Sequence, residues 1–186
     1  MMNEQENGNT IRTLDLYTGG GGSLLAGRLL GWSCACAVES DFYAAAALEK
    51  RQADLGEQFP IWTNAEDFDC FGTCPVTGER WRDRIDGVVA GFPCQPWSAA
   101  SAGAAKGQHD HRNQWPTVAR ILRDLGPGCR FALLENSAQL CAFDYFGQIL
   151  ADLEALGFNA AWQTRAASSV DSCNHRRSRL WVYCWR

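Results

Sequence analysis

The chain has 186 residues, of which 46% are hydrophobic and 20% are charged, a balance typical of a globular protein with a sizeable core. Collagen-like, coiled-coil and disordered chains are excluded by this composition. No stretch approaches the about 18 consecutive apolar residues of a membrane span, and the polar N-terminus lacks the apolar segment of a signal peptide. We therefore expect one domain over residues 1–186, without a membrane partner, in the cytoplasm.

The charge of the chain is acidic overall and unevenly distributed. The net charge of −4 at pH 7 argues against general binding to nucleic acid through a field of positive charge. Residues 165–186 nevertheless hold five Arg against one Asp, which gives +4 to this stretch and −8 to the residues before it. A polyanion should therefore meet the C-terminal end of the chain.

Short apolar runs alternate with amphipathic segments along the chain. The apolar runs predict strands at 13–17, 34–39, 87–92, 129–136, 160–169 and 179–185. The amphipathic segments predict helices at 23–31, 42–52, 117–126 and 144–157, the second of them capped by Asp41. This alternation indicates an α/β fold with a doubly wound, mostly parallel sheet, in which ligands lie outside the carboxyl ends of the strands.

The nine cysteines are expected to be free thiols, because their number is odd and nothing marks the chain for secretion. Cys34 and Cys36 alternate in an apolar run, so both should face one side of a strand. Cys70 and Cys74 are spaced loosely for a zinc half-site, and the histidines of 109–111 lie in a polar, Gly-rich stretch. We therefore predict no metal site.

Four glycines at 19–22 follow the first predicted strand. They let the backbone turn sharply and approach a ligand, while the N–H groups of the next helix can bind an anion. Leu24 takes the third glycine position of the fingerprint G-x-G-x-x-G, which disfavours a nicotinamide cofactor. Glu39 ends the second strand, where an acidic residue commonly binds ribose hydroxyls. Together these features predict an adenosine ligand without pyrophosphate, a description that S-adenosylmethionine fits.

The segment GFPCQPWS at residues 91–98 follows a predicted buried strand. Its two prolines fix the backbone on both sides of Cys94, whose thiol emerges at the carboxyl end of the strand, where a reactive group can be presented. The segment closely resembles the Gly-Phe-Pro-Cys-Gln-Pro-Phe-Ser loop of the cytosine-C5 DNA methyltransferase family. It differs from that loop only by Trp97.

The resemblance extends along most of the chain and keeps the order of the family's motifs. Residues 15–22 (DLYTGGGG) are similar to the cofactor loop Asp-Leu-Phe-x-Gly-x-Gly-Gly, and Asn64 stands where the family usually has an Asp that contacts adenine. Further matches are GQHDHR at 107–112 to Gly-x-x-Asp-x-Arg, LENS at 134–137 to Glu-Asn-Val, and HRRSR at 175–179 to Gln-x-Arg-x-Arg. In the last motif, His replaces Gln.

The resemblance implies an S-adenosylmethionine-dependent methyltransferase of Rossmann-like fold. Its catalytic residues would be Cys94, which adds to carbon 6 of cytosine, Glu135, which holds the ring N3 and amino group, and the pair Arg177 and Arg179, which bind the base carbonyl and a phosphate. The implied cofactor residues are Asp15, Tyr17, Gly19, Gly21, Glu39 and Asn64. The implied substrate loop includes Pro93, Gln95 and Ser98.

Sequence-specific members of the family are longer, with a target-recognition region and a closing motif after the Gln-x-Arg-x-Arg strand, whereas this chain ends seven residues after Arg179. We therefore expect a minimal, phage-like enzyme of a bacterium or a phage-infected cell that binds cytosine-containing DNA weakly and with little specificity alone. Recognition would come from a separate subunit or from self-association. Two alternatives stay open: the same Cys94 chemistry on a free cytosine nucleotide, and a catalytically weak or purely binding subunit.

Overall fold

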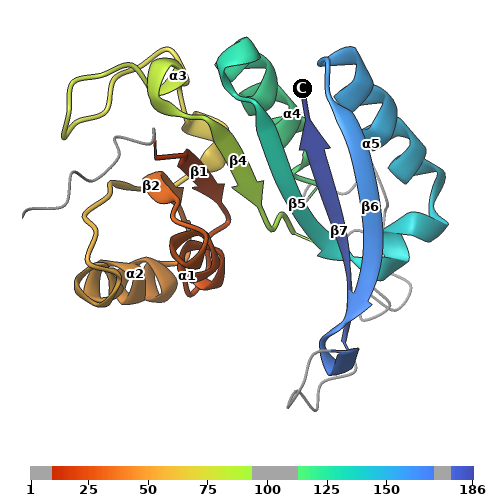
Figure 1. Cartoon of the computed structure of the whole chain (residues 1–186), viewed down its shortest axis with the longest axis horizontal. Coiled ribbons are helices and arrows are strands. Elements are labelled where there is room, and N and C mark those ends of the chain that lie inside the picture. Colours follow the sequence, from red (N-terminus) through yellow and green to blue (C-terminus); the bar gives the residue numbers. More distant parts are fainter. Residues whose placement is uncertain (1–9, 94–112, 170–176) are drawn as a thin grey trace, which may run out of the picture.

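A computed structural model of the chain describes residues 10–93, 113–169 and 177–186, which form one seven-stranded sheet with helices on both faces (Figure 1). The strands are β1 (Arg12–Leu16), β2 (Ser33–Val38), β3 (Ile61–Trp62), β4 (Gly87–Ala90), β5 (Phe131–Ser137), β6 (Asn159–Ala166) and β7 (Ser178–Trp185). The α-helices are α1 (Gly22–Leu29), α2 (Phe42–Leu55), α3 (Trp81–Arg84), α4 (Trp115–Leu125) and α5 (Asp144–Ala155).

The order of the strands across the sheet is β3-β2-β1-β4-β5-β7-β6. Neighbouring strands run parallel from β3 to β5, whereas β7 is antiparallel to both β5 and β6. The order proceeds outward from β1 in one direction and from β4 in the other, which is the doubly wound arrangement. The predicted α/β fold with a mostly parallel sheet is therefore confirmed.

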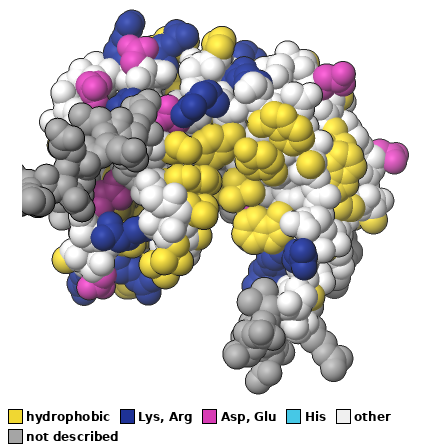
Figure 2. Space-filling model, in the orientation of Figure 1, with side chains coloured by type: hydrophobic (Ala, Val, Ile, Leu, Met, Phe, Trp, Pro, Cys, Tyr) yellow, Lys and Arg dark blue, Asp and Glu magenta, His cyan; other side chains and the backbone are white. Residues whose placement is uncertain are grey.

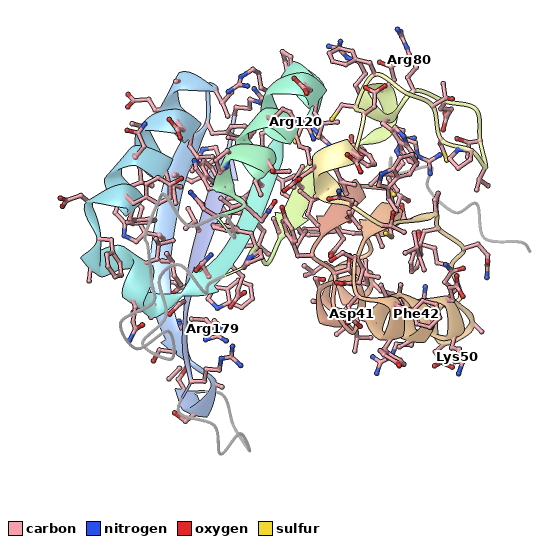
Figure 3. All side chains as sticks on the ribbon, turned by 180° about the vertical axis from the view of Figure 1, so that it is seen from behind. Asp41, Phe42, Lys50, Arg80, Arg120 and Arg179 are labelled. Carbon is pink, nitrogen blue, oxygen red and sulfur yellow. The ribbon has the colours of Figure 1, made fainter. Side chains whose placement is uncertain are left out.

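The helices divide between the two faces of the sheet. Helices α1 and α2 pack on β2 through a cluster that includes Leu24, Leu48 and Cys34. Helices α3, α4 and α5 lie on the other face, where α4 contacts both of its helical neighbours. Seen from behind, α4 and α5 cover this face of the sheet (Figure 3). The core is thus two apolar layers on either side of the sheet.

Local sequence signals set the ends of the helices. The Asp41 carboxylate accepts a hydrogen bond from the Ala44 N–H at 2.8 Å and so caps α2, as the sequence predicted. The same helix ends at Gly56, whose φ of 64° is a left-handed conformation that favours glycine. Helix α4 begins with a proline in its first turn and ends at Gly126, before Pro127.

Strand β2 contains a bulge that the sequence did not reveal. Thr13 pairs with Cys34 and Leu14 pairs with Cys36, so Ala35 is the extra residue opposite β1. The bulge reverses the alternation of side chains. Cys34 therefore packs with α1 and α2, whereas Cys36 packs in the cluster on the other face. The prediction that both cysteines face one side of the strand was wrong for this reason.

Gly87 begins β4 beside the ring of Phe131 on β5. A Cβ added at Gly87 would collide with three carbon atoms of that ring, which itself packs against Trp32 with ring centroids 5.0 Å apart. We expect Gly87→Ala to lower the free energy of unfolding by about 1–3 kcal/mol, because the ring must leave its packed position. Urea unfolding measures this loss. The control Gly147→Ala, at a helical site with open space, should instead stabilise by about 0.5–1 kcal/mol. Equal effects would contradict the prediction.

None of the described helices covers β5, β7 and β6 on the face of the sheet that carries α1 and α2. Trp181, Tyr183 and Trp185 alternate along β7 and are 38%, 49% and 39% exposed. Hydrophobic side chains gather there as a patch (Figure 2). Strand β6 forms the edge of the sheet, and no described segment pairs with its outer side. None of the helices in the described part combines the length and apolar composition that a membrane span requires.

Candidate active site

The loop after β1 turns through unusual backbone conformations. Tyr17 has a φ of 58°, which is rare for a residue with a side chain, and its hydroxyl donates to Gln114 Oε1 at 3.1 Å. Gly21 has a φ of 84°, and a Cβ at this position would lie 2.9 Å from Leu48 Cδ2. The glycine therefore lets the loop approach α2 closely. Helix α1 starts directly after it, so its first N–H groups border the carboxyl end of β1.

Asp15 places a buried carboxyl group under this loop. Asp15 is the penultimate residue of β1 and is only 2% exposed. Burial raises the pKa of Asp15 to about 7, while side-chain hydrogen bonds with Ser23 and Thr18 act in the opposite direction. A carboxyl group held in this way favours a cationic partner, because a nearby positive charge would stabilise its ionised form.

A cavity of about 420 Å³ opens above Asp15. Its lining comes from the β1 loop, from Ala26 in α1 and Leu30 just after it, and from the ends of β4 and β5. The cavity brings together three of the residues predicted from sequence, Asp15, Tyr17 and Glu135. This volume lies within the range of about 300–1,000 Å³ that is usual for small-molecule sites.

Replacing Asp15 with Asn should stabilise the folded chain above pH 7 by up to about 4 kcal/mol, because each unit of raised pKa corresponds to about 1.4 kcal/mol. The folded state keeps a proton that the unfolded state releases between about pH 4 and 7, so the wild-type chain loses stability as the pH rises through this window. Urea unfolding at pH 4, 5.5 and 8 should show the gain growing with pH. The exposed residue Asp54 supplies the control variant D54N, and a pH-independent gain in D15N would exclude this cause.

Glu135 and Arg179 form an ion pair across neighbouring strands. Arg179 Nε lies 2.5 Å from Glu135 Oε1, and both side chains are only partly exposed. Burial raises the pKa of Glu135, and the positive charge of Arg177 acts in the opposite direction. The ion pair with Arg179 also favours the ionised form, so burial acts against both arginines at this carboxyl group. Figure 3 shows Arg179 toward the end of the sheet where β7 begins.

The end of β4 leads directly past this ion pair. A Cβ added at Gly91 would be 3.4 Å from Glu135 Oε2, so the backbone passes close to the carboxylate. The buried side chain of Asn136 donates to the Phe92 carbonyl at 3.2 Å and anchors the segment just before Pro93. Sequence reasoning did not assign this role to Asn136. Its position beside Glu135, at the end of a strand, was the signal for it.

Glu39 and Asn64 do not line the cavity and have partners within the chain. The Glu39 carboxylate accepts hydrogen bonds from the Gly19 N–H at 2.6 Å and from the Asp41 N–H at 2.8 Å, so it fixes the glycine loop against the start of α2. Asn64 accepts from the Glu66 N–H and caps the short helix η1 (Ala65–Asp67). Their contacts with a ligand stay predictions.

Several predicted residues fall at or beyond the limits of the described segments. Pro93 is the last described residue after β4, and Cys94, Gln95 and Ser98 lie outside the described residues. Arg177 is exposed just before β7. The histidines of 109–111 also lie outside the described part. Among the described residues, no group of three or more His, Cys, Asp or Glu side chains is arranged to hold a metal ion.

The cysteines in the described part of the chain are all free, as predicted. Burial raises the pKa of the Cys70 and Cys184 thiols to about 12 and that of Cys129 to about 11. Such thiols stay protonated near neutral pH and are poor nucleophiles. Cys141 is exposed.

Comparison with known proteins places this site in context. The C-5 cytosine-specific DNA methylase family matches residues 11–186. Type II methyltransferase M.BsuFI of Bacillus subtilis is 30% identical over 181 residues, which are 95% of this chain and 40% of that protein. Type II methyltransferase M.HhaI of Haemophilus parahaemolyticus is 25% identical over 179 residues, which are 95% of this chain and 49% of that protein. The chain thus spans less than half the length of these relatives.

Solved structures share the fold. A DNMT2 mutant from Spodoptera frugiperda superimposes with a TM-score of 0.69 at 21% identity, over 95% of this chain and 50% of that chain. The Dnmt2 methyltransferase of S. pombe gives a TM-score of 0.69 at 18% identity, over 94% of this chain and 50% of that chain. These likenesses agree with the Rossmann-like architecture expected from the sequence.

Proposed function

The chain belongs to the C-5 cytosine-specific DNA methylase family, and we propose that it transfers a methyl group from S-adenosylmethionine to carbon 5 of cytosine in DNA. One observation carries this proposal. The Glu135–Arg179 ion pair lies beside the end of β4, which leads to Cys94, and beside the cavity over Asp15. A nucleophile, an acid and a cofactor pocket would then lie together at the carboxyl ends of the parallel strands. We further propose that residues 1–186 act as a single catalytic domain.

The cavity supports S-adenosylmethionine as the methyl donor. That cofactor carries a positively charged sulfonium and an amino group, and the buried Asp15 carboxyl is suited to a cationic partner. Tyr17, Thr18 and Gly22 of the loop line the cavity, and the positive φ angles of Gly19 and Gly21 let the backbone turn between them. Glu39 holds Gly19 in place and, with Asn64, would meet the ribose and adenine. When bound, the cofactor supplies the methyl group.

The proposed reaction starts with the Cys94 thiolate. Its sulfur adds to carbon 6 of cytosine, while Glu135 acts as the general acid and donates its proton to N3. The raised pKa of Glu135 favours this role, because the carboxyl group keeps its proton at higher pH. Arg179 then stabilises the Glu135 carboxylate that remains and, with Arg177, binds the base carbonyl and a neighbouring phosphate.

The addition turns carbon 5 into a nucleophile that can take the methyl group. Transfer of the carbon 5 proton to a base such as water, departure of the Cys94 thiolate from carbon 6 and return of the N3 proton to Glu135 then restore the neutral aromatic ring. A base stacked in a duplex cannot reach these groups, so a duplex substrate requires that the target nucleotide be flipped out. Pro93, Gln95 and Ser98 would shape the loop that presents Cys94 to the flipped base.

The aromatic surface on β7 supports a protein partner in DNA binding. Tyr183 and Trp185 expose large side chains away from the proposed acid, whereas most of the chain is acidic and repels phosphates. We propose that a recognition subunit or a second copy covers this surface. Sedimentation velocity of the chain over a range of concentrations tests the second possibility.

A radiolabelled methyl-transfer assay tests the proposed function. Wild-type chain is supplied with labelled S-adenosylmethionine and with duplex DNA, single-stranded DNA or deoxycytidine monophosphate. We expect label in DNA, at carbon 5 of cytosine. Label in the mononucleotide alone would replace DNA by a free nucleotide as the substrate. Cofactor binding without transfer to any of the three would favour a binding subunit.

A further inference from the structure

A second, open pocket of about 410 Å³ lies beside the candidate active site, on the face of the sheet that carries the aromatic patch. It is lined by Leu133, Gln163, Arg165, Ser169 and Trp181. Leu133 and Trp181 also line the cavity over Asp15, so the two hollows share a wall. None of the residues predicted for the reaction lines this second pocket.

The register of the sheet fixes where this pocket lies relative to the proposed acid. Glu135, Trp181 and Gln163 occupy directly opposite positions on β5, β7 and β6, and they form one row across the sheet. The row spans two strand spacings, or about 10 Å. Two residues further toward the carboxyl end of β5, on the same face of the sheet, Arg165 lies directly opposite Arg179. A group bound in the pocket is therefore an immediate neighbour of a base held at Glu135.

The chemistry of the pocket combines a cation with an aromatic surface. Arg165 is exposed, and its Nε donates to Gln163 Oε1 at 3.2 Å, which orients the guanidinium along β6. Of the residues that the structure describes, none forms an ion pair with Arg165. Trp181 presents its ring at 38% exposure beside it. A guanidinium binds phosphate and an indole ring stacks on a base, so the pair matches one nucleotide.

We propose that this pocket holds the nucleotide that adjoins the target cytosine in a DNA strand, with its base on Trp181 and its phosphate on Arg165. The proposal rests on the proposed function and narrows its substrate, because a free cytosine nucleotide has no neighbour to fill the pocket. It also assigns to Gln163 the role of a positioning residue for Arg165. The substrate class is therefore a polynucleotide strand rather than a mononucleotide.

Binding measurements on single-stranded DNA test the phosphate contact without requiring turnover. The anisotropy of a labelled oligonucleotide with one cytosine is titrated with chain at several salt concentrations. We expect Arg165→Ala to reduce the magnitude of the slope of log affinity against log salt by about one. The control Arg123→Ala removes the same charge from an exposed site on α4, on the other face of the sheet, and should leave the slope as in wild type. An equal slope in both variants would overturn the phosphate contact.

A matched pair of tryptophans tests the stacking contact. Trp181→Ala should weaken oligonucleotide binding about 5- to 150-fold, and Trp181→Phe should recover most of this loss because a ring remains. Trp162 on β6 is 51% exposed but packs against Phe146 on the other face of the sheet, outside the pocket. Trp162→Ala should therefore bind as wild type does. Equal losses in the two alanine variants would refute stacking at Trp181.

Methyl-transfer assays with an oligonucleotide and with deoxycytidine monophosphate distinguish failure of the nucleotide pocket from failure of the proposed function. If wild type methylates DNA, Arg165→Ala should raise the KM for the oligonucleotide and leave the rate with deoxycytidine monophosphate unchanged. An equal loss with both substrates would overturn the neighbour-nucleotide role. If no cytosine substrate is methylated while Arg165→Ala still changes the salt slope, the proposed function fails and the nucleotide pocket stands.

Discussion

Replacing Cys94 with Ala should abolish methyl transfer, with a fall in turnover on the order of 10⁴-fold or more, because removal of the nucleophile leaves carbon 5 of cytosine without activation. Cofactor affinity should change little, since the described residues that line the cavity over Asp15 come mainly from β1 and its loop, from α1 and from the carboxyl ends of β4 and β5. The assay measures single-turnover transfer to DNA at saturating cofactor, and calorimetry measures cofactor binding in the same variant.

A mechanism-based trap provides the second readout for Cys94. In the presence of S-adenosylmethionine, DNA that contains 5-fluorocytosine should form a stable covalent adduct with the wild-type chain, because after methyl transfer carbon 5 holds fluorine in place of the proton whose loss would release Cys94. The exposed residue Cys141 supplies the control variant C141A, which should form the adduct at the wild-type rate. An adduct that persists in the Cys94→Ala variant would assign the nucleophile to another residue.

Glu135→Gln should lower the turnover number by about 10²–10⁴-fold, the usual contribution of a positioned general acid, while the KM for DNA changes less. The glutamine side chain can still donate a hydrogen bond to N3 but has no acidic proton to transfer. The wild-type rate should fall as the pH rises through the raised pKa of Glu135, because the protonated fraction then declines. In the variant this limb of the pH profile should disappear.

Two controls distinguish loss of the general acid from loss of stability in Glu135→Gln. The loss of a charge partner for Arg179 can destabilise the fold, so thermal unfolding of the variant is compared with that of wild type. Glu154→Gln, at an exposed position on α5, should leave both rate and pH profile unchanged. A pH limb that persists in Glu135→Gln would show that another group supplies the proton.

The main strands and helices of the fold could be predicted because their signals are local. The buried strands β1, β4 and β5 are short apolar runs, and α2 has a cap at Asp41 that the structure confirms. Strand β3 and helix α3 were not predicted, because the two residues of β3 are too few for an apolar run and the four residues of α3 are too few to show a helical period. The bulge at Ala35 leaves no mark in composition, since cysteine and alanine are accepted on either face of a buried strand.

The candidate site was predictable in its residues but not in its contacts. The position of Glu135 at a strand end and that of the glycines after β1 follow from the order of the elements. The hydrogen bonds that Glu39 makes to Gly19 and Asp41 depend on how α2 turns back onto the sheet, which no sequence pattern records. The pocket at Arg165 depends on the antiparallel pairing of β6 with β7, which no local pattern in either strand records.

Strand β6 has a consequence for how the isolated chain behaves at high concentration. Its eight residues contain no proline and a single charge, at Arg165, and most of its side chains are exposed. An unprotected edge of this kind offers a row of backbone N–H and C=O groups as a template for intermolecular β-pairing. Stacked pairing would lead to insoluble aggregates, and added salt would promote them by screening the one charge that opposes the contact. The substitution Ala161→Lys should reduce this aggregation, and Ala161 does not line the proposed nucleotide pocket.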